Sequence, residues 1–184
     1  MTDLTKWKKI RETSQKVGWR YVTEKIFIDP EGNEQSYTTW NRPNDKAAAV
    51  IALTPDNRVV IVQMYRQGPE KIQFDLPAGL VDEGEDIEAA ARRELLEETG
   101  YVTDERLEYL GSYHWGAYNN LESHYFFARN CTQKVTPERI RDEYIVVNLI
   151  SIEKLIQNAK SGLVGDAAAV LMAYEKLNEI QEGS

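Results

Sequence analysis

The sequence predicts a mixed α+β fold, and three observations support this prediction. Residues 19–41 contain two alternating, aromatic-rich runs around a polar turn, which is typical of a β-hairpin. The short apolar runs 47–53 and 59–65 are suited to buried strands, and residues 144–150 are expected to form another strand. Helical patterns begin near Glu85 and again in the C-terminal part of the chain.

The segments between these elements complete the expected order. Residues 1–16 leave two alternatives open, a frayed helix and a first strand. Residues 66–78 are rich in glycine and proline and are expected to form a loop around the short segment IQFDL. Residues 106–115 and 122–128 read as two further strands, joined by the loop GAYNNL.

Two helices are expected near the C-terminus. Residues 151–162, SIEKLIQNAKSG, begin with a serine cap and end at Gly162. Asp166 opens a last helix, DAAAVLMAYEKLNEI, whose apolar residues fit a core-facing stripe. The residues of this expected stripe are Val170, Leu171, Tyr174 and Leu177.

Length, composition and charge limit the class of protein. A chain of 184 residues is long enough for one domain with a sizeable core. The net charge of −8 argues against nucleic acid as a partner, which would need a basic face. An anionic small substrate remains compatible, because bound metal ions invert the local field. One cysteine, Cys131, and the lack of a membrane span or signal-peptide core predict a soluble cytoplasmic protein without a membrane partner.

The stretch 79–101, GLVDEGEDIEAAARRELLEETGY, contains the most informative cluster of charges. In a helix that begins near Glu85, positions i, i+3 and i+4 lie on one face. Glu94, Glu97 and Glu98 have this spacing and have apolar neighbours. Carboxylate oxygens are the ligands that Mg²⁺ prefers, so the pattern predicts a site for a hard divalent cation.

Two further points bear on this cation site. Residues 77–79 and Gly84 frame a tight turn before the helix, and glycine permits a main-chain carbonyl to approach a ligand closely. The alternative interpretation is a solvated helix face on which Arg93 and Glu97 form an i,i+4 ion pair. The three glutamates alone do not decide between a metal site and such a surface.

The longer pattern resembles the Nudix box, GX5EX7REUXEEXGU, in which U is a bulky apolar residue. Leu95 fills the first U position and Tyr101 the last, where aliphatic residues are usual. Seven specified residues match by chance on the order of once in 10⁹ starting positions. The seven residues at the fixed positions are Gly79, Glu85, Arg93, Glu94, Glu97, Glu98 and Gly100.

The resemblance implies an enzyme that hydrolyses a nucleoside diphosphate linked to another moiety. It implies Mg²⁺ as the cofactor, for which Mn²⁺ can substitute. Glu94, Glu97 and Glu98 are expected as metal ligands, and Glu97 also as a catalytic residue. Glu85 and Arg93 are expected to brace the loop and the helix as an ion pair.

Neighbouring segments are similar to the ADP-ribose pyrophosphatase branch, which hydrolyses nucleoside diphosphate sugars. The matching stretches are VQMYRQGPEKIQF, LPAGLVDEGED and KSGLVGDAAAV. On this likeness the carbonyl of Ala78 joins the metal shell and Arg66 faces the substrate. Glu143 takes the position of a loop glutamate that positions or deprotonates the attacking water. The alternative for Glu143 is a solvated loop acid.

The same likeness divides the chain into two parts. Residues 1–44 form an N-terminal antiparallel β extension, which in this branch helps to build a homodimer, often by strand exchange. Residues 45–184 form the Nudix domain, a mixed β-sheet sandwiched between helices. The aromatic residues Trp19, Tyr21 and Trp40 are expected to pack in the core or at the dimer interface, and the alternative is that they sandwich a base across that interface.

The loop HWGAY at residues 114–118 bears on the substrate. ADP-ribose hydrolases commonly have a Pro-Gly pair here, whereas this chain keeps Gly116 and has Trp115 instead of proline. A tyrosine near Tyr118 is associated with diadenosine polyphosphate hydrolases, which are the alternative substrate class. Trp115 and Tyr118 are expected either to stack on a base or sugar or to pack at a loop–core boundary. A third hypothesis is a non-catalytic Nudix module that senses a nucleotide, but the complete box favours the enzyme.

Overall fold

The structure is a computed structural model that describes residues 6–136 and 144–183. The chain divides into two compact units. We call residues 1–46 with 114–122 the N-terminal unit, and residues 47–113 with 123–184 the sandwich unit. Within the described residues, no helix has both the length and the apolar character needed to cross a membrane.

The elements follow in chain order and their bounds are these. The strands of the first part are β1 (Lys8–Val17), β2 (Arg20–Ile28) and β3 (Glu34–Trp40). The strands and helix that follow are β4 (Lys46–Leu53), β5 (Val59–Arg66), β6 (Lys71–Asp75), β7 (Ala78–Leu80), α1 (Ile87–Thr99) and β8 (Tyr101–Val102). The last elements are β9 (Glu108–His114), β10 (Glu122–Ala128), β11 (Thr132–Gln133), β12 (Val146–Ile150), α2 (Ile152–Lys160), α3 (Ala167–Met172) and α4 (Tyr174–Glu182).

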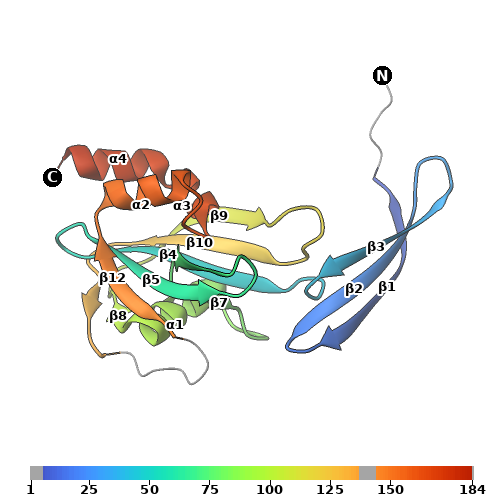
Figure 1. Cartoon of the computed structure of the whole chain (residues 1–184), viewed down its shortest axis with the longest axis horizontal. Helices are drawn as coiled ribbons and strands as arrows, with labels where there is room; N and C mark the ends of the chain where they lie inside the picture. Colours follow the sequence, from blue (N-terminus) through green and yellow to red (C-terminus); the bar gives the residue numbers. More distant parts are fainter. Residues whose placement is uncertain (1–5, 137–143, 184) are drawn as a thin grey trace. The chain divides into compact units, whose positions relative to one another are not determined.

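The N-terminal unit is built on an antiparallel sheet of order β1-β2-β3 (Figure 1). The predicted hairpin over residues 19–41 is confirmed as β2 and β3, and residues 8–17 resolve the open choice in favour of a strand. The turn between β2 and β3 is closed by the carboxylate of Asp29, which accepts hydrogen bonds from the amides of Glu31 and Asn33.

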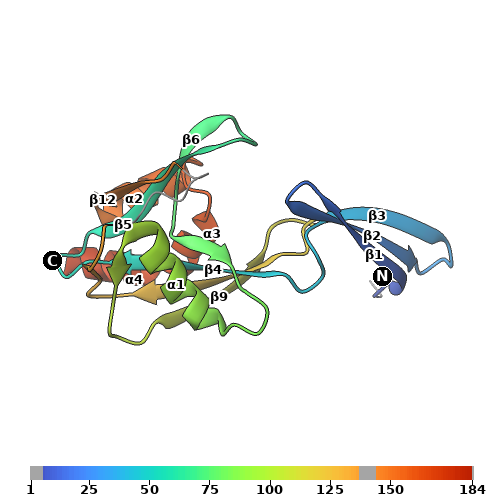
Figure 2. The same ribbon diagram turned by 90° about the horizontal axis from the view of Figure 1, so that it is seen from below.

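The sandwich unit has a central sheet of order β12-β5-β4-β10-β9, to which β6 adds beside β5 and β7 beside β4. Helices α2, α3 and α4 cover one face of this sheet, and α1 covers the other (Figures 1 and 2). The helices therefore bury both faces of the central strands. This arrangement confirms the predicted α+β class and the sheet sandwiched between helices.

Strand β4 is buried on both faces, as its apolar run predicts. Successive side chains of a strand point to opposite faces, so alternate residues join different core clusters. The small residues on the α1 side permit Ala90 and Ala91 of that helix to pack close to the sheet. Ala49, Ile51 and Leu53 join the cluster that contains residues of α2 and α4, and Ala48, Val50 and Ala52 join the cluster that contains residues of α1.

The segment 66–78 differs from the predicted loop, because it contains β6 and the first residue of β7. Strand β6 forms a hairpin with the preceding β5, and its other edge pairs with a segment far away in the sequence. The amide of Phe74 donates to the carbonyl of Leu163, and the amide of Gly165 donates to the carbonyl of Phe74. Both edges of β6 are therefore paired, one with β5 and the other with a segment that follows α2.

The predicted last helix is in fact two helices, α3 and α4, which are separated at Ala173. The ψ angle of Ala173 is 4°, far from the value in an α-helix. Because the helix is interrupted there, the four residues of the expected apolar stripe do not all face the core. Val170 and Leu177 are buried as predicted. Leu171 is 77% exposed and Tyr174 is 38% exposed, so their assignment to the core was wrong.

Candidate active site

Helix α1 is held at both ends by its own sequence. It begins at Ile87, two residues later than predicted, because the side chain of Asp86 accepts hydrogen bonds from the amides of Glu88 and Ala89. It ends at Gly100, whose φ of 75° is left-handed and whose amide donates to the carbonyl of Leu96 at 2.8 Å. The last fixed glycine of the box is therefore also the residue at which the helix ends.

The three glutamates of α1 have different surroundings. Glu98 is 7% exposed, and its Oε2 accepts a hydrogen bond of 2.9 Å from the amide of Ala78 in β7. The side chain of Glu94 is 12% exposed and that of Glu97 is 50% exposed. Two carboxylates are thus enclosed against the sheet and the third reaches solvent.

Gly79 makes room for the carboxylate of Glu94. A Cβ atom at residue 79 would lie 2.0 Å from Oε1 of Glu94, far inside contact distance. Gly79 does not have a positive φ angle, so its role differs from the conformational freedom that the sequence suggested. Strand pairing of Ala48 with Gly79 and of Ala49 with Ala78 fixes this approach. Only glycine at this position admits the carboxylate.

The predicted ion pair between Glu85 and Arg93 is confirmed. Nε of Arg93 lies 2.9 Å from Oε1 of Glu85, and Nη2 lies 3.0 Å from Oε2. The same Nη2 donates to the carbonyl of Leu80, which ties the loop before α1 to the helix. The hydrogen bonds from Arg93, with a further one from the amide of Asp82, lower the pKa of Glu85 to about 2.

Arg93 also contacts two of the expected metal ligands. Its Nη1 lies 2.5 Å from Glu94 and 3.3 Å from Glu97. The i,i+4 pair of the alternative interpretation is therefore present together with the Glu85 brace. Across residues 6–136 and 144–183, no three acidic, histidine or cysteine side chains are grouped closely enough to hold an ion as they stand.

The donor set nevertheless fits a hard divalent cation. It supplies three carboxylates from one helix face, and oxygen ligands of this kind suit Mg²⁺. Glu98 is already oriented by the amide of Ala78, and Glu94 by the space above Gly79. The Arg93 guanidinium contacts one oxygen of the Glu94 carboxylate and is also paired with Glu85.

Arg66 belongs to a second charged cluster in the sandwich unit. Its Nε and Nη2 each lie 2.7 Å from Oδ2 of Asp75, and its side chain is 44% exposed. Asp75 is only 3% exposed, and its Oδ1 accepts a hydrogen bond of 3.0 Å from the amide of Gly165. A Cβ atom at Gly165 would lie 2.2 Å from that oxygen, so glycine is required here for space.

Asp166 adds a second carboxyl group to this cluster. Burial of the carboxyl group and the nearby charge of Asp75 raise the pKa of Asp166 to about 7, while Arg66 acts in the opposite direction. The hydroxyl of Tyr125 lies 3.5 Å from Oδ1 of Asp166. Asp166 therefore changes its charge near neutral pH, whereas an ordinary aspartate is ionised there.

The sequence analysis assigned no role to Asp75 and treated Asp166 only as the start of a helix. One signal was present, because Asp75 is an acidic residue inside the otherwise apolar and uncharged segment IQFDLP. Its partner Gly165 lies ninety residues further along the chain. No local pattern links residues at such a separation.

The remaining predicted site residues lie elsewhere. Trp115 and Tyr118 belong to the N-terminal unit, where they are 37% and 58% exposed. Glu143 lies outside the described residues. Of the predicted set, the structure bonds the amide of Ala78 to Glu98 and places the Glu94 carboxylate beside Gly79, while Glu97 reaches solvent.

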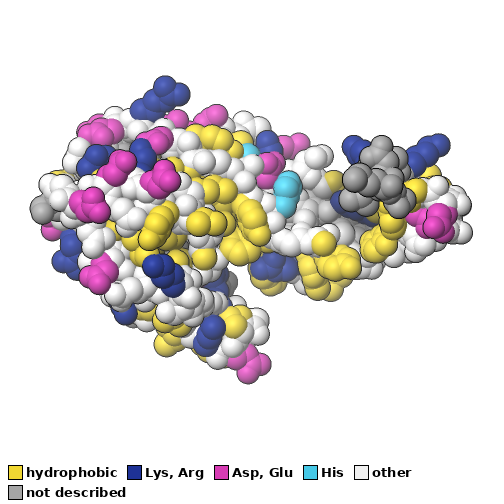
Figure 3. Space-filling view, turned by 90° about the horizontal axis from the view of Figure 1, so that it is seen from above, with side chains coloured by type: hydrophobic (Ala, Val, Ile, Leu, Met, Phe, Trp, Pro, Cys, Tyr) yellow, Lys and Arg dark blue, Asp and Glu magenta, His cyan; other side chains and the backbone are white. Residues whose placement is uncertain are grey.

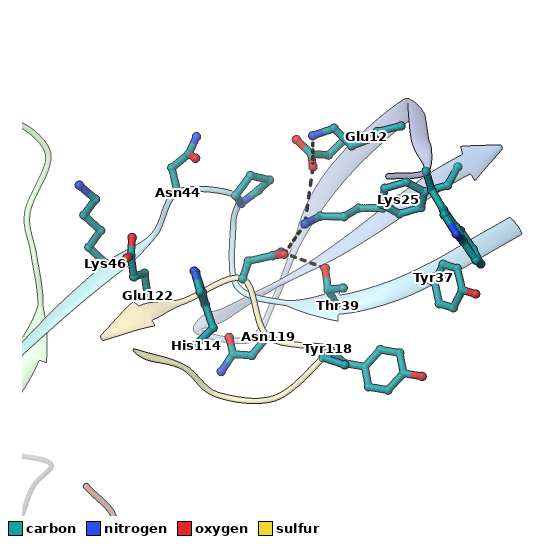
Figure 4. A pocket seen from close by; sticks show the side chains of 16 residues that line it. Glu12, Lys25, Tyr37, Thr39, Asn44, Lys46, His114, Tyr118, Asn119 and Glu122 are labelled. Carbon is teal, nitrogen blue, oxygen red and sulfur yellow. Dashed lines mark hydrogen bonds and ion pairs between the residues drawn. The ribbon is translucent and has the colours of Figure 1, made fainter. Parts of the chain in front are cut away.

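Tyr118 lines an open groove of about 760 Å³ within the N-terminal unit (Figure 4). Tyr37 and Lys25 also line this groove. The ammonium group of Lys25 donates to Oδ1 of Asn120 and lies 3.8 Å from Glu12. Asn120 in turn donates to the hydroxyl of Thr39 at 2.9 Å, so these polar groups bond chiefly to one another.

Comparison with known proteins identifies the family. Residues 43–171 match the family model of the NUDIX domain, and the chain belongs to this family. It is 32% identical over 136 residues to the methanol dehydrogenase activator of Bacillus methanolicus. The matched region covers 72% of this chain and 73% of that protein. It is 29% identical over 135 residues to the ADP-ribose pyrophosphatase of Bacillus subtilis (strain 168), with the same two coverages of 72% and 73%. A crystal structure of an ADP compounds hydrolase matches 97% of this chain and 98% of its own, with a TM-score of 0.77 at 18% identity, which confirms the Nudix fold.

The space above Gly79 gives a first prediction. In Gly79→Ala, the new methyl group moves the Glu94 carboxylate, because the end of a flexible side chain gives way more readily than the sheet. We expect binding of Mn²⁺, measured by electron paramagnetic resonance, to weaken by about tenfold or more, as for other changes that disturb the orientation of ligands. Gly68→Ala is the control, because a Cβ atom there meets nothing within 4 Å. Equal Mn²⁺ affinity of the two variants would contradict this account of Gly79.

Asp166 gives a second prediction, on the pH dependence of stability. Its pKa is about 7 in the folded chain and about 3.9 in the unfolded chain, so the unfolded state loses its proton first as the pH rises. The free energy of unfolding should therefore decrease from about pH 4 to pH 7, by a few kcal/mol at most. Asp166→Asn should remove most of this decrease, as measured by urea unfolding at several pH values. Asp104→Asn, at an exposed residue, should leave it unchanged, and an identical slope in all three proteins would refute the assignment.

Proposed function

We propose that this chain is a divalent-metal-dependent pyrophosphatase that hydrolyses ADP-ribose or a related nucleoside diphosphate sugar. The products are a nucleoside monophosphate and a sugar phosphate. The observation that supports this most strongly is the complete Nudix box on a helix whose Glu94 and Glu98 are oriented by Gly79 and by the amide of Ala78. Similarity to proteins named ADP-ribose pyrophosphatase and ADP compounds hydrolase supports the substrate class.

The proposed cofactor is Mg²⁺, for which Mn²⁺ can substitute. Glu94, Glu97 and Glu98 would hold it, together with the carbonyl of Ala78. When bound, the ion neutralises the diphosphate and lowers the pKa of the attacking water. The net charge of −8 supports a need for such a cation, because the chain as a whole repels an anionic substrate.

The residues of the chain then have distinct proposed roles. The oxygen of a water molecule attacks one phosphorus, the bond from that phosphorus to the bridging oxygen breaks, and the second phosphate leaves with the bridging oxygen. Glu143 positions this water or accepts its proton, and Glu97 acts with it. Arg66 binds a phosphate oxygen, and Trp115 and Tyr118 stack on the base or the sugar. The Arg93 guanidinium keeps the loop before α1 in place through Glu85.

We also propose that residues 1–44 are a dimerisation element attached to a Nudix domain of residues 45–184. Nine of the ten residues of β1 are exposed, and a three-stranded sheet needs a second layer to bury its apolar side chains. Trp19 is 75% exposed and Ile10 is 47% exposed. Figure 3 shows exposed apolar side chains on this unit as well as on the sandwich unit. A second copy of the chain would cover such residues.

A cytoplasmic location is proposed on the basis of the one cysteine. Cys131 is buried and forms no disulfide. Burial, with the charge of Glu105 as the second cause, raises the pKa of its thiol to about 12. A thiol that stays protonated is a poor nucleophile and is slow to oxidise. The described residues of the fold therefore contain no disulfide bond that an oxidising compartment would have to form.

Turnover of a nucleotide panel tests the proposed activity. With Mg²⁺ and alkaline phosphatase as the coupling enzyme, we expect phosphate release from ADP-ribose, ADP-glucose or GDP-mannose, and less from diadenosine polyphosphates. Glu98→Gln should lower kcat by about 100-fold or more, because it removes a charge from the metal site. The control is Glu83→Gln, at an exposed acid before the helix, which should stay within about twofold of the parent protein.

Three outcomes of this panel would count against the proposal. Tight binding of nucleotides without any turnover would favour the sensing module. Preferred cleavage of diadenosine polyphosphates would correct the substrate class. Full activity of Glu98→Gln would show that the ion does not need this carboxylate.

The oligomeric state is the next prediction. Light scattering after gel filtration should give twice the chain mass of 21.1 kDa. Ile10→Asp combined with Trp19→Asp should shift the protein to the monomer at micromolar concentration, because two charges would be buried without partners at the interface. Leu171→Asp is the control, since that residue is 77% exposed on the sandwich unit. A monomeric parent protein would refute the dimer.

A further inference from the structure

In the Arg66–Asp75 pair, a buried carboxylate holds an arginine whose side chain is partly exposed to solvent. We call this pair the Arg66 support. Asp75 is 3% exposed, and its Oδ2 accepts a hydrogen bond of 2.7 Å from Nε of Arg66. Nη2 of Arg66 lies 2.7 Å from the same oxygen as an ion pair, and the Arg66 side chain is 44% exposed. A guanidinium group has five N–H donors in a planar fork, so donors remain for an anion in solvent.

Asp75 itself has little freedom to move. Its Oδ1 accepts the amide of Gly165, and there is no space for a Cβ atom at that glycine. The backbone of the preceding residue is paired as well. The amide of Phe74 donates to the carbonyl of Leu163, and the carbonyl of Phe74 accepts from the amide of Gly165. The carboxylate is therefore fixed from two directions, and it fixes the plane of the guanidinium in turn.

The chain also limits the distance between this pair and the metal carboxylates. Asp75 and Ala78 are three residues apart, so their Cα atoms lie within about 11 Å of each other. Ala78 is bonded through its amide to Glu98 of α1. The short segment from Asp75 to Ala78 therefore has the partner of Arg66 at one end and the residue bonded to Glu98, a proposed metal ligand, at the other. This span is comparable to the length of a nucleoside diphosphate.

We propose that Asp75 is a positioning residue that acts through Arg66, and that it holds the guanidinium in one orientation to bind a phosphate oxygen of the nucleotide substrate. The inference rests on the proposed function, because it requires a phosphate ligand. Fixing a flexible arginine before the substrate arrives removes an entropy cost from binding. The alternative is that Arg66 only neutralises the buried Asp75, and this alternative predicts no effect of Asp75 on substrate binding.

Asp166 supplies an independent readout. The groups that face it are Asp75 on β6, Arg66 on β5, and the Tyr125 hydroxyl on β10. When Asp166 ionises near neutral pH, it adds a second negative charge beside Asp75 and close to Arg66. Phosphate binding by Arg66 should then weaken. In Asp166→Asn this charge cannot form.

The test is a double-mutant cycle on the full chain, with ADP-ribose or the best substrate of the panel. Asp75→Asn and Arg66→Ala should each raise KM about tenfold, with kcat within about threefold, because uniform binding is lost. The double variant should have the KM of Arg66→Ala alone, since Asp75 acts only through the arginine. Asp104→Asn is the control at an exposed aspartate. Between pH 6 and 8, KM should rise in the parent protein and stay flat in Asp166→Asn.

Several results would overturn the inference. These are an unchanged KM in either single variant, multiplication of the two effects in the double variant, or the same pH profile of KM in the parent protein and Asp166→Asn. If Asp75→Asn is not folded by circular dichroism, Gly165→Ala replaces it, because its methyl group displaces the same carboxylate. An unchanged KM in Gly165→Ala would then refute the positioning role. A parent protein that turns over no nucleotide would refute the proposed function instead.

Discussion

The close approach of helix α1 to the sheet is the constraint on which the rest of the candidate site depends. Alanines on both sides, such as Ala48 in β4 and Ala90 in α1, permit this approach. The end of the helix is then near enough to β7 for Glu98 to bond the amide of Ala78 and for Glu94 to occupy the space above Gly79. Core packing thus orients two carboxylates, and larger side chains at this interface would move both of them.

The cost of gathering these carboxylates is met by one arginine. Arg93 bonds Glu85 through two nitrogens and also contacts Glu94 and Glu97. Like charges on one helix face repel each other, and the guanidinium offsets this repulsion. A divalent ion offers more charge to the same oxygens. One side chain therefore explains both how the fold tolerates the cluster and why Glu85 belongs to the same motif as the proposed metal ligands.

The sequence predicted the local features well and the long-range ones poorly. Asp86 and Gly100 limit α1 by contacts within a few residues, so the helix and its carboxylate face could be predicted almost to the residue. The buried strand β4 could likewise be predicted from its apolar run. Strand β6 was missed although it forms a local hairpin with β5, and only its second edge, with Leu163 and Gly165, is long-range. The cluster of Asp75 and Asp166 was missed because Asp75 bonds Gly165, ninety residues further along the chain. No glycine or proline marks the break at Ala173.

The two charged clusters of the sandwich unit solve opposite electrostatic problems. On α1, three glutamates create a surplus of negative charge that a bound cation can satisfy. At β5 and β6, one arginine faces two carboxyl groups, and the raised pKa of Asp166 limits the negative charge there below neutral pH. While Asp166 is neutral, Asp75 is the one acidic partner that opposes the charge of Arg66 in this cluster. An ionised Asp166 would add a second negative charge there, in a chain whose net charge of −8 already opposes an anionic substrate.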